Sequence, residues 1–209
     1  MMKKTLTAIA LIGAMVTAQA ASIENFANVA ALGAAGWILN NASTAGGTTD
    51  WFQGNASVFT SQAGANDAYI AANYNNAPPG GTISNWLITP TFSTDNFGSV
   101  SFWARADAAP GYRDTLEYGL IGVAGAPASF IVSAAFTVPT DAWTLYTLNF
   151  LGTGAGTASR FAIHYSGLAD DANYVGVDSL GIHLPGPTTP LMLGIGLLGL
   201  LAARRRTQH

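Results

Sequence analysis

Short apolar runs, separated by clusters of turn-forming residues, recur along most of this chain. Seven of these runs are rich in β-branched and aromatic residues and predict strands: Ser84–Pro90, Ser99–Arg105, Leu116–Val123, Ser129–Val138, Trp143–Phe150, Arg160–Tyr165 and Tyr174–His183. The segment Asn40–Asp50 contains no large apolar residue and is predicted to be a loop. Because the periodicity of an amphipathic helix is almost absent, the pattern indicates an all-β domain.

Alternation within two of the runs predicts which face each strand buries. Their apolar residues occupy every second position: Tyr146, Leu148 and Phe150 in one, and Phe161, Ile163 and Tyr165 in the other. Antiparallel strands with one face in a core and one in water produce this pattern. We therefore expect a single all-β domain over residues 21–184, a two-sheet β-sandwich of the jelly-roll type.

The first 20 residues have the order of features found in a secretory signal peptide. Two lysines precede an apolar core, Leu6–Val16, which is followed by the small-x-small sequence Ala18-Gln19-Ala20. We expect the export machinery to translocate the chain through the inner membrane. Signal peptidase would then cut so that the mature chain begins near Ala21.

The C-terminal end combines a proline-rich hinge with a second apolar segment. Thr188–Ala203 contains no charge, and its 16 residues would form a helix of about 24 Å, somewhat short for a hydrocarbon core of about 30 Å. The glycines in this segment and the cluster Arg204, Arg205 and Arg206 after it are typical of a membrane helix with a cytoplasmic basic end. We expect a transmembrane helix over 188–203 that leaves the domain outside.

Charge and cysteine content restrict the chemistry of the part between these two ends. It contains three arginines against all eleven acidic residues of the chain, a net charge of −8. A surface of this sign repels nucleic acid, so no nucleic-acid partner is expected. The chain has no cysteine, which excludes disulfides, thiolate metal sites and cysteine nucleophiles.

The end segment, 185–209, has three features in order: a Pro-x-Pro motif, the apolar run and the arginine cluster. This order resembles the PEP-CTERM sorting signal, with Pro185, Gly186 and Pro187 as the motif and Gly186 where the family has glutamate. The resemblance implies handling by an exosortase-type membrane transpeptidase and release to the cell surface or extracellular matrix. If Gly186 prevents cutting, the segment instead remains as a simple anchor.

Nine short motifs follow one another between residues 22 and 183. They are Gly36-Trp37, Trp51-Phe52-Gln53-Gly54-Asn55, Tyr69-Ile70-Ala71-Ala72-Asn73-Tyr74, Asn85-Trp86-Leu87-Ile88-Thr89-Pro90, Ser101-Phe102-Trp103-Ala104-Arg105, Asp114-Thr115-Leu116-Glu117, Ala142-Trp143, Arg160-Phe161-Ala162-Ile163 and Tyr174-Val175-Gly176-Val177-Asp178. In this order they resemble the choice-of-anchor J domain, a relative of the cleaved-adhesin domains. The resemblance implies a jelly-roll sandwich on a secreted or surface-attached bacterial protein, used for adhesion or as an accessory module.

Glu24 near the first strand and Asp178 in the last strand are the candidate metal ligands. In jelly rolls similar to this family the first and last strands lie side by side, and several hold a structural calcium. Calcium takes six to eight oxygen ligands, so the two carboxylates would share Ca²⁺ with loop carbonyls. Further donors would be Asn25, Asp50 and Asp67. Family members often carry a second acid where this chain has Ser179, and the alternative is that both acids are ordinary solvated strand ends.

Trp103 and Arg105 are the candidate ligand-binding residues. In the run Ser99–Arg105 they alternate with Val100 and Phe102, which places both on the face opposite the core. An exposed indole ring there would stack on a sugar ring. The alternative is that a loop covers this face, since large aromatic residues usually fill cores.

No catalytic residues are predicted, because the chain contains neither Gly-x-Ser-x-Gly nor His-Glu-x-x-His. We therefore expect a non-enzymatic binding or adhesion module at the cell surface or in a biofilm matrix, with extracellular polysaccharide as a candidate partner. The alternative is a secreted carbohydrate-binding accessory domain or a polysaccharide hydrolase. Acidic loops such as Asp170-Asp171 motivate the hydrolase.

Overall fold

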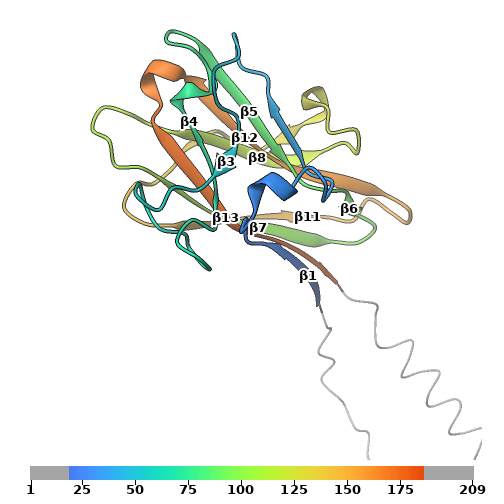
Figure 1. The fold of residues 1–209 in the computed structure, drawn as a ribbon. Coiled ribbons are helices and arrows are strands. Elements are labelled where there is room, and N and C mark those ends of the chain that lie inside the picture. Colours follow the sequence, from blue (N-terminus) through green and yellow to red (C-terminus); the bar gives the residue numbers. More distant parts are fainter. Residues whose placement is uncertain (1–18, 186–209) are drawn as a thin grey trace, which may run out of the picture. The chain divides into compact units, whose positions relative to one another are not determined.

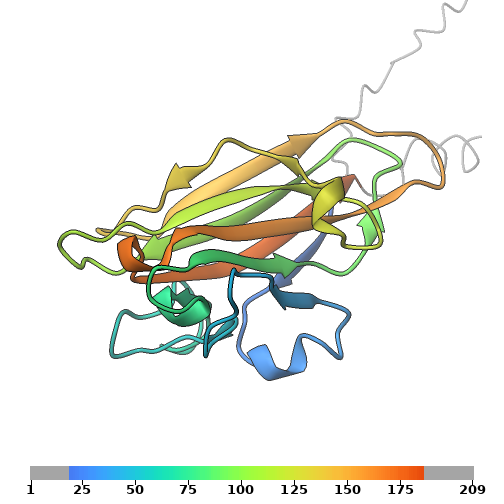
Figure 2. The ribbon, with the colours of Figure 1, turned by 90° about the horizontal axis from the view of Figure 1, so that it is seen from above.

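Two antiparallel sheets pack face to face in the computed structural model, which describes residues 19–185 (Figures 1 and 2). The first sheet contains β1 (Gln19–Glu24), β3 (Phe52–Gln53), β4 (Ile70–Asn73), β7 (Gly98–Ala106), β11 (Thr144–Phe150) and β13 (Tyr174–Pro185). The second contains β2 (Ile38–Asn41), β5 (Thr82–Ile88), β6 (Phe92–Ser93), β8 (Thr115–Ile121), β9 (Ile131–Val132), β10 (Phe136–Thr137) and β12 (Ala158–Leu168). Residues Ala21–Leu184 form one compact unit. The predicted all-β, two-sheet sandwich is confirmed.

The chain crosses repeatedly from one sheet to the other. The central strands are ordered β4-β13-β7-β11 in the first sheet and β5-β12-β8-β10 in the second, which is the order of a jelly roll. Strand β1 pairs with β13, so the first and last strands lie side by side as expected.

The two alternating strands bury the faces that their sequences predict. Phe161, Ile163 and Tyr165 of β12 are buried between the sheets. From the opposite sheet, Phe150 belongs to the same core, and Tyr146 and Leu148 pack against it.

The segment Ser129–Val138 is not the single strand that the sequence predicts. Its paired positions, Val132 to Phe136, are four steps apart, whereas their partners on β8, Gly119 to Leu116, are three steps apart. The extra residue is a β-bulge that divides the segment into β9 and β10. The predicted loop Asn40–Asp50 is also too long, because its first two residues belong to β2 and pair with β5.

The helical elements of the described residues are short 3₁₀ turns: η1 (Val29–Ala31), η2 (Tyr74–Asn76), η3 (Pro127–Ser129) and η4 (Ala169–Asp171). Within residues 19–185, none of these is long or apolar enough to cross a membrane. The expected membrane helix 188–203 lies outside the described residues. So do Gly186, Pro187, the arginine cluster and nearly all of the expected signal peptide.

Candidate ligand-binding site

Three loops meet at one end of the sandwich and enclose a cleft. They are the β4–β5 loop with η2, the β7–β8 loop, and the β12–β13 loop with η4 (Figure 1, upper left). The cleft has a volume of about 530 Å³ and is lined by Tyr74, Pro79, Tyr112, Ala169, Asp170, Ala172 and Asn173.

Two tyrosines give the cleft an unusual surface. Tyr74 is 47 % exposed and Tyr112 is 49 % exposed, although both line the same hollow. An aromatic ring left half in water within a concave site presents apolar area to a ligand, and its hydroxyl adds a hydrogen-bonding group.

Backbone hydrogen bonds tie the three loops to one another. The Tyr74 N–H donates to the Asn173 carbonyl (3.0 Å), and the Arg113 N–H donates to the Asp171 carbonyl (2.7 Å). A turn at Pro78–Gly81 completes the rim, with the Gly81 N–H donating to the Pro78 carbonyl (2.8 Å). Because each loop is fixed to its neighbour, the cleft is formed before a ligand arrives.

The polar side chains of the cleft are also held in place. Oδ1 of Asp170 accepts a hydrogen bond from the Gly80 N–H (2.9 Å), where Gly80 has a φ of +73° that favours glycine. The amide Nδ2 of Asn173 donates to Oδ2 of Asp107 (2.9 Å). A carboxylate and an amide are thereby oriented beside the two tyrosines.

Asp114 is the buried anchor of this end, with an exposed fraction of 2 %. Its Oδ1 accepts hydrogen bonds from the Tyr165 hydroxyl (2.5 Å) and the Asn173 N–H (3.0 Å), and its Oδ2 accepts from the Tyr174 N–H (3.2 Å). Burial raises the pKa of this carboxyl, while the three hydrogen bonds favour its ionised form. The carboxylate thus fixes the start of β13 and one wall of the cleft.

Comparison with known proteins identifies the fold but no sequence family. The K1 cleaved adhesin domain of Lys-gingipain from Porphyromonas gingivalis W83 superimposes with a TM-score of 0.60 at 19 % identity, covering 80 % of this chain and 99 % of that domain. The K3 domain of the same protein gives 0.58 at 17 % identity, covering 79 % and 99 %. The fold is therefore similar to that of a cleaved adhesin domain. No family model matches the sequence, and no curated protein does.

Trp103 and Arg105 lie on the outer face of the first sheet, as alternation predicts. Both are half-buried, and the segment between β3 and β4 folds over part of this face. The Arg105 guanidinium lies 4.9 Å above the ring of Phe59 from that segment. Neither predicted residue lines the cleft, and their role in ligand binding stays a prediction.

Asp178 is fully buried on the same face and holds the covering segment. Its Oδ2 accepts hydrogen bonds from the backbone N–H groups of Gln62 (2.8 Å) and Ala63 (3.1 Å), and its Oδ1 accepts from the Ser179 N–H (2.5 Å). Burial raises the pKa of Asp178 against the effect of these donors. The donors occupy the carboxylate oxygens that a calcium ion would need.

Glu24 uses one carboxylate oxygen locally, since its Oε1 accepts from the Phe26 N–H (2.7 Å). Within residues 19–185, no group of three or more His, Asp or Glu side chains is placed to hold a metal ion. The calcium site at Glu24 and Asp178 stays a prediction.

A hydrogen-bonded chain that sequence reasoning missed crosses the outer face of the second sheet. Ser84 Oγ lies 3.0 Å from His164 Nε2, and His164 Nδ1 lies 2.8 Å from Glu117 Oε2. The strand register brings these groups together, because His164 of β12 pairs with Glu117 on β8 and with Trp86 on β5. The indole of Trp86 stacks on the imidazole at 3.9 Å and donates to Ser84 Oγ (3.1 Å).

These groups have the connectivity of a Ser-His-acid triad in surroundings that do not suit hydrolysis. Ser84 lies within β5, which pairs with β12 on one side and β2 on the other, so neighbouring backbone N–H groups serve the ladders. Its own N–H donates to Ser43 Oγ (2.9 Å). An acyl-transfer site needs hydrogen-bond donors aimed at a developing oxyanion. We therefore interpret the Ser84–His164–Glu117 hydrogen bonds as structural.

Burial lowers the pKa of His164, with Glu117 acting in the opposite direction. The unfolded state takes up this proton near the ordinary pKa of about 6.5, whereas the folded state takes it up at lower pH. The unfolded state therefore binds more protons in this window, and the free energy of unfolding should fall as pH drops below about 6.5. Urea titrations at several pH values should show that His164→Gln removes this part of the slope.

The matched control is His183→Gln, which leaves the His164 network intact and should retain the acid-side slope. If the slope of His164→Gln equals that of the parent chain, other groups cause the acid sensitivity.

Proposed function

We propose that this chain is an exported, non-enzymatic binding module that holds an extracellular carbohydrate in the cleft lined by Tyr74 and Tyr112. The cleft itself carries the proposal: two half-exposed aromatic rings, a carboxylate and an amide share one hollow of about 530 Å³. Aromatic rings suit the C–H faces of sugar rings, while Asp170 and Asn173 suit hydroxyl groups.

The charge around the cleft selects among carbohydrates. Asp107, Asp170 and Asp171 lie in the loops that form it, and the expected mature domain carries a net charge of −8. Polymers rich in uronic acid would be repelled at low and moderate salt, because like charges near a surface raise the free energy of association. A neutral polysaccharide is therefore the proposed ligand.

The two ends of the sequence support a location outside the inner membrane. The signal-peptide pattern motivates export and processing by signal peptidase, and the PEP-CTERM-like segment motivates handling by an exosortase-like transpeptidase. The adhesin-type fold is compatible with display at the cell surface or in a biofilm matrix. Within this proposal the C-terminal segment anchors the module in the membrane at least transiently.

Binding to an array of neutral and acidic polysaccharides tests the site. We expect the chain to bind neutral polymers, and Tyr74→Ala and Tyr112→Ala each to weaken binding about tenfold, or about 1.4 kcal/mol. Isothermal titration with an oligosaccharide of the bound polymer gives the affinities.

Trp103→Ala is the control, because Trp103 does not line the cleft. It should bind as the parent chain does. Loss of binding in Trp103→Ala with normal binding in both tyrosine variants would move the site to the outer face of the first sheet. Sugar release by the parent chain would contradict the non-enzymatic part of the proposal.

A further inference from the structure

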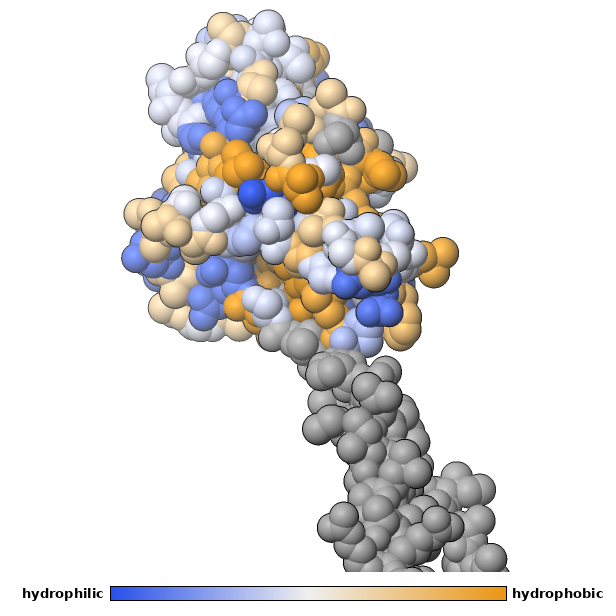
Figure 3. All heavy atoms as spheres, turned by 90° about the vertical axis from the view of Figure 1, so that its right-hand side faces the viewer, coloured by the Kyte–Doolittle hydropathy of each residue, from blue (hydrophilic) through white to orange (hydrophobic). Residues whose placement is uncertain are grey.

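The end of the sandwich opposite the cleft exposes two large apolar side chains next to each other. Phe97 is 67 % exposed and Leu151 is 84 % exposed. The last paired residues of β7 and β11 are Gly98 and Phe150, so Phe97 and Leu151 are the next positions on the two neighbouring strands. Figure 3 looks onto this end and shows apolar side chains gathered among polar ones.

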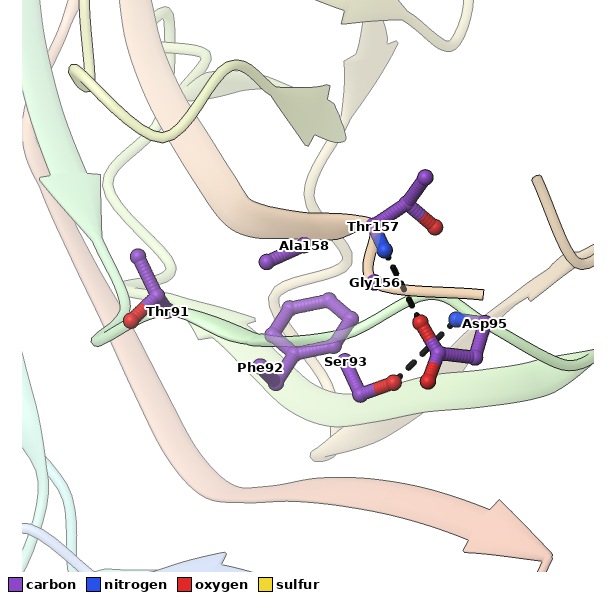
Figure 4. Close-up of a pocket in the computed structure, with 7 residues that line it drawn as sticks. All are labelled: Thr91, Phe92, Ser93, Asp95, Gly156, Thr157 and Ala158. Carbon is purple, nitrogen blue, oxygen red and sulfur yellow. Dashed lines mark hydrogen bonds between the residues drawn. The ribbon is translucent and has the colours of Figure 1, made fainter. Parts of the chain in front are cut away.

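The loops that carry these residues are tied to one another. The Thr153 N–H donates to the Thr94 carbonyl (2.8 Å), and the Thr157 N–H donates to Oδ1 of Asp95 (2.9 Å; Figure 4). A Cβ at Gly152 would lie 2.6 Å from the Asp95 carbonyl, which shows how closely the loops approach. Phe97 and Leu151 are therefore held in place and are not tips of independent loops.

The chain leaves the sandwich at this same end. His183 of β13 pairs with Ser99 at the start of β7, and β13 ends at Pro185. The apolar segment expected to enter the membrane begins at Thr188, three residues later. A chain reaches at most about 3.5 Å per residue, so about 10 Å can separate the end of β13 from that segment.

We propose that Phe97 and Leu151 insert into the headgroup interface of the membrane that anchors the C-terminal segment. The inference rests on the anchoring described under the proposed function. Two side chains are too few for a stable protein interface, which buries about 800 Å² per partner. A bilayer interface accepts single aromatic and leucine side chains, and the tether keeps them close to it.

Membrane contact at this end determines where the cleft points. Strand β13 has 12 residues, and the 11 steps between them, at about 3.3 Å each, separate its two ends by about 36 Å. Tyr174 at its start adjoins the cleft, and Pro185 at its end adjoins the tether. The two apolar contacts would thus hold the cleft upright and facing away from the bilayer.

The absence of cysteine makes a site-specific test direct. Phe97→Cys and Leu151→Cys variants of the exported chain, including its C-terminal segment, are labelled with an environment-sensitive nitrobenzoxadiazole dye. They are reconstituted in vesicles of phosphatidylethanolamine with some phosphatidylglycerol. For the dye at positions 97 and 151, we expect fluorescence emission at a shorter wavelength in vesicles than in detergent-free buffer. We also expect brominated lipids to reduce its fluorescence intensity. Leu168→Cys is the matched control, an exposed leucine at the cleft end that should stay in water.

Flotation of the same samples separates failure of this inference from failure of the tether. If the chain floats with the vesicles but labels at 97 and 151 behave like the label at 168, the apolar pair does not touch the membrane and the inference is wrong. If the chain does not float, the membrane anchor of the proposed function is wrong as well. The dye could also emit at a shorter wavelength in the absence of vesicles and show no quenching by brominated lipids. That result would assign Phe97 and Leu151 to a contact with another copy of the chain, and it would also overturn the inference.

Discussion

Asp114→Ala should lower the free energy of unfolding by about 3–5 kcal/mol. The substitution leaves two buried donors, the Tyr165 hydroxyl and the Tyr174 N–H, and the part-buried Asn173 N–H without an acceptor. Each unsatisfied buried donor costs about 1–3 kcal/mol, and relief of the buried charge offsets part of the sum. Urea denaturation at neutral pH measures the change.

Two further variants are the controls for the stability of Asp114→Ala. Asp141→Ala removes an exposed carboxylate that accepts a hydrogen bond from the neighbouring Ala142 N–H, and it should change stability by less than about 0.5 kcal/mol. Asp114→Asn keeps one acceptor oxygen and should fall between the two. If Asp114→Ala is no less stable than Asp141→Ala, the buried carboxylate does not anchor the start of β13.

The same anchor connects stability to the proposed function. Asn173 lines the cleft and donates its backbone N–H to Asp114, so loss of the carboxylate should loosen one wall of the cleft. Asp114→Asn should therefore bind carbohydrate more weakly than Asp141→Ala under conditions where both are fully folded.

The long strands could be predicted because their own residues determine which face is buried. Strand β7 alternates in burial over its nine residues and β11 over its seven, so each sequence identifies the face that packs in the core. In β12 the large residues Phe161, Ile163 and Tyr165 share one face, although Ala162 between them is also buried. The two-residue strands β3 and β6 carry no such signal. Phe52 and Gln53 form β3 because β4 offers partners at Ala71 and Ile70, and that pairing depends on the tertiary fold.

The cleft lined by Tyr74 and Tyr112 could not be predicted from the sequence, because it also depends on the tertiary fold. Tyr74 and Tyr112 come from loops separated by several strands, and nothing in either loop distinguishes its tyrosine from one that packs inward. Alternation correctly placed Trp103 on the outer face of its sheet. It could not show that a segment near Phe59 covers part of that face, because loops carry no period from which their path can be read.

Asp178→Ala should release that covering segment, with a loss of about 2–3 kcal/mol in the free energy of unfolding. The carboxylate is the shared acceptor for the N–H groups of Gln62 and Ala63, and the segment's Phe59 and Tyr69 pack with Trp143 on the sheet. Without the acceptor these amides regain partners only by opening to water, so the damage should be local. Hydrogen exchange of residues 55–66 should accelerate far more than exchange in β12.

Asp141→Ala is the control, an exposed acid outside this segment and outside the proposed calcium site, which should leave exchange unchanged. Chelation then decides what holds the segment. If Ca²⁺ binds between Glu24 and Asp178, EDTA should give the parent chain the rapid exchange and lower melting temperature of Asp178→Ala. If backbone donors alone satisfy the carboxylate, EDTA should leave the parent chain unchanged while Asp178→Ala still opens. Unchanged exchange in Asp178→Ala would show that aromatic packing around Phe59 is sufficient without the carboxylate.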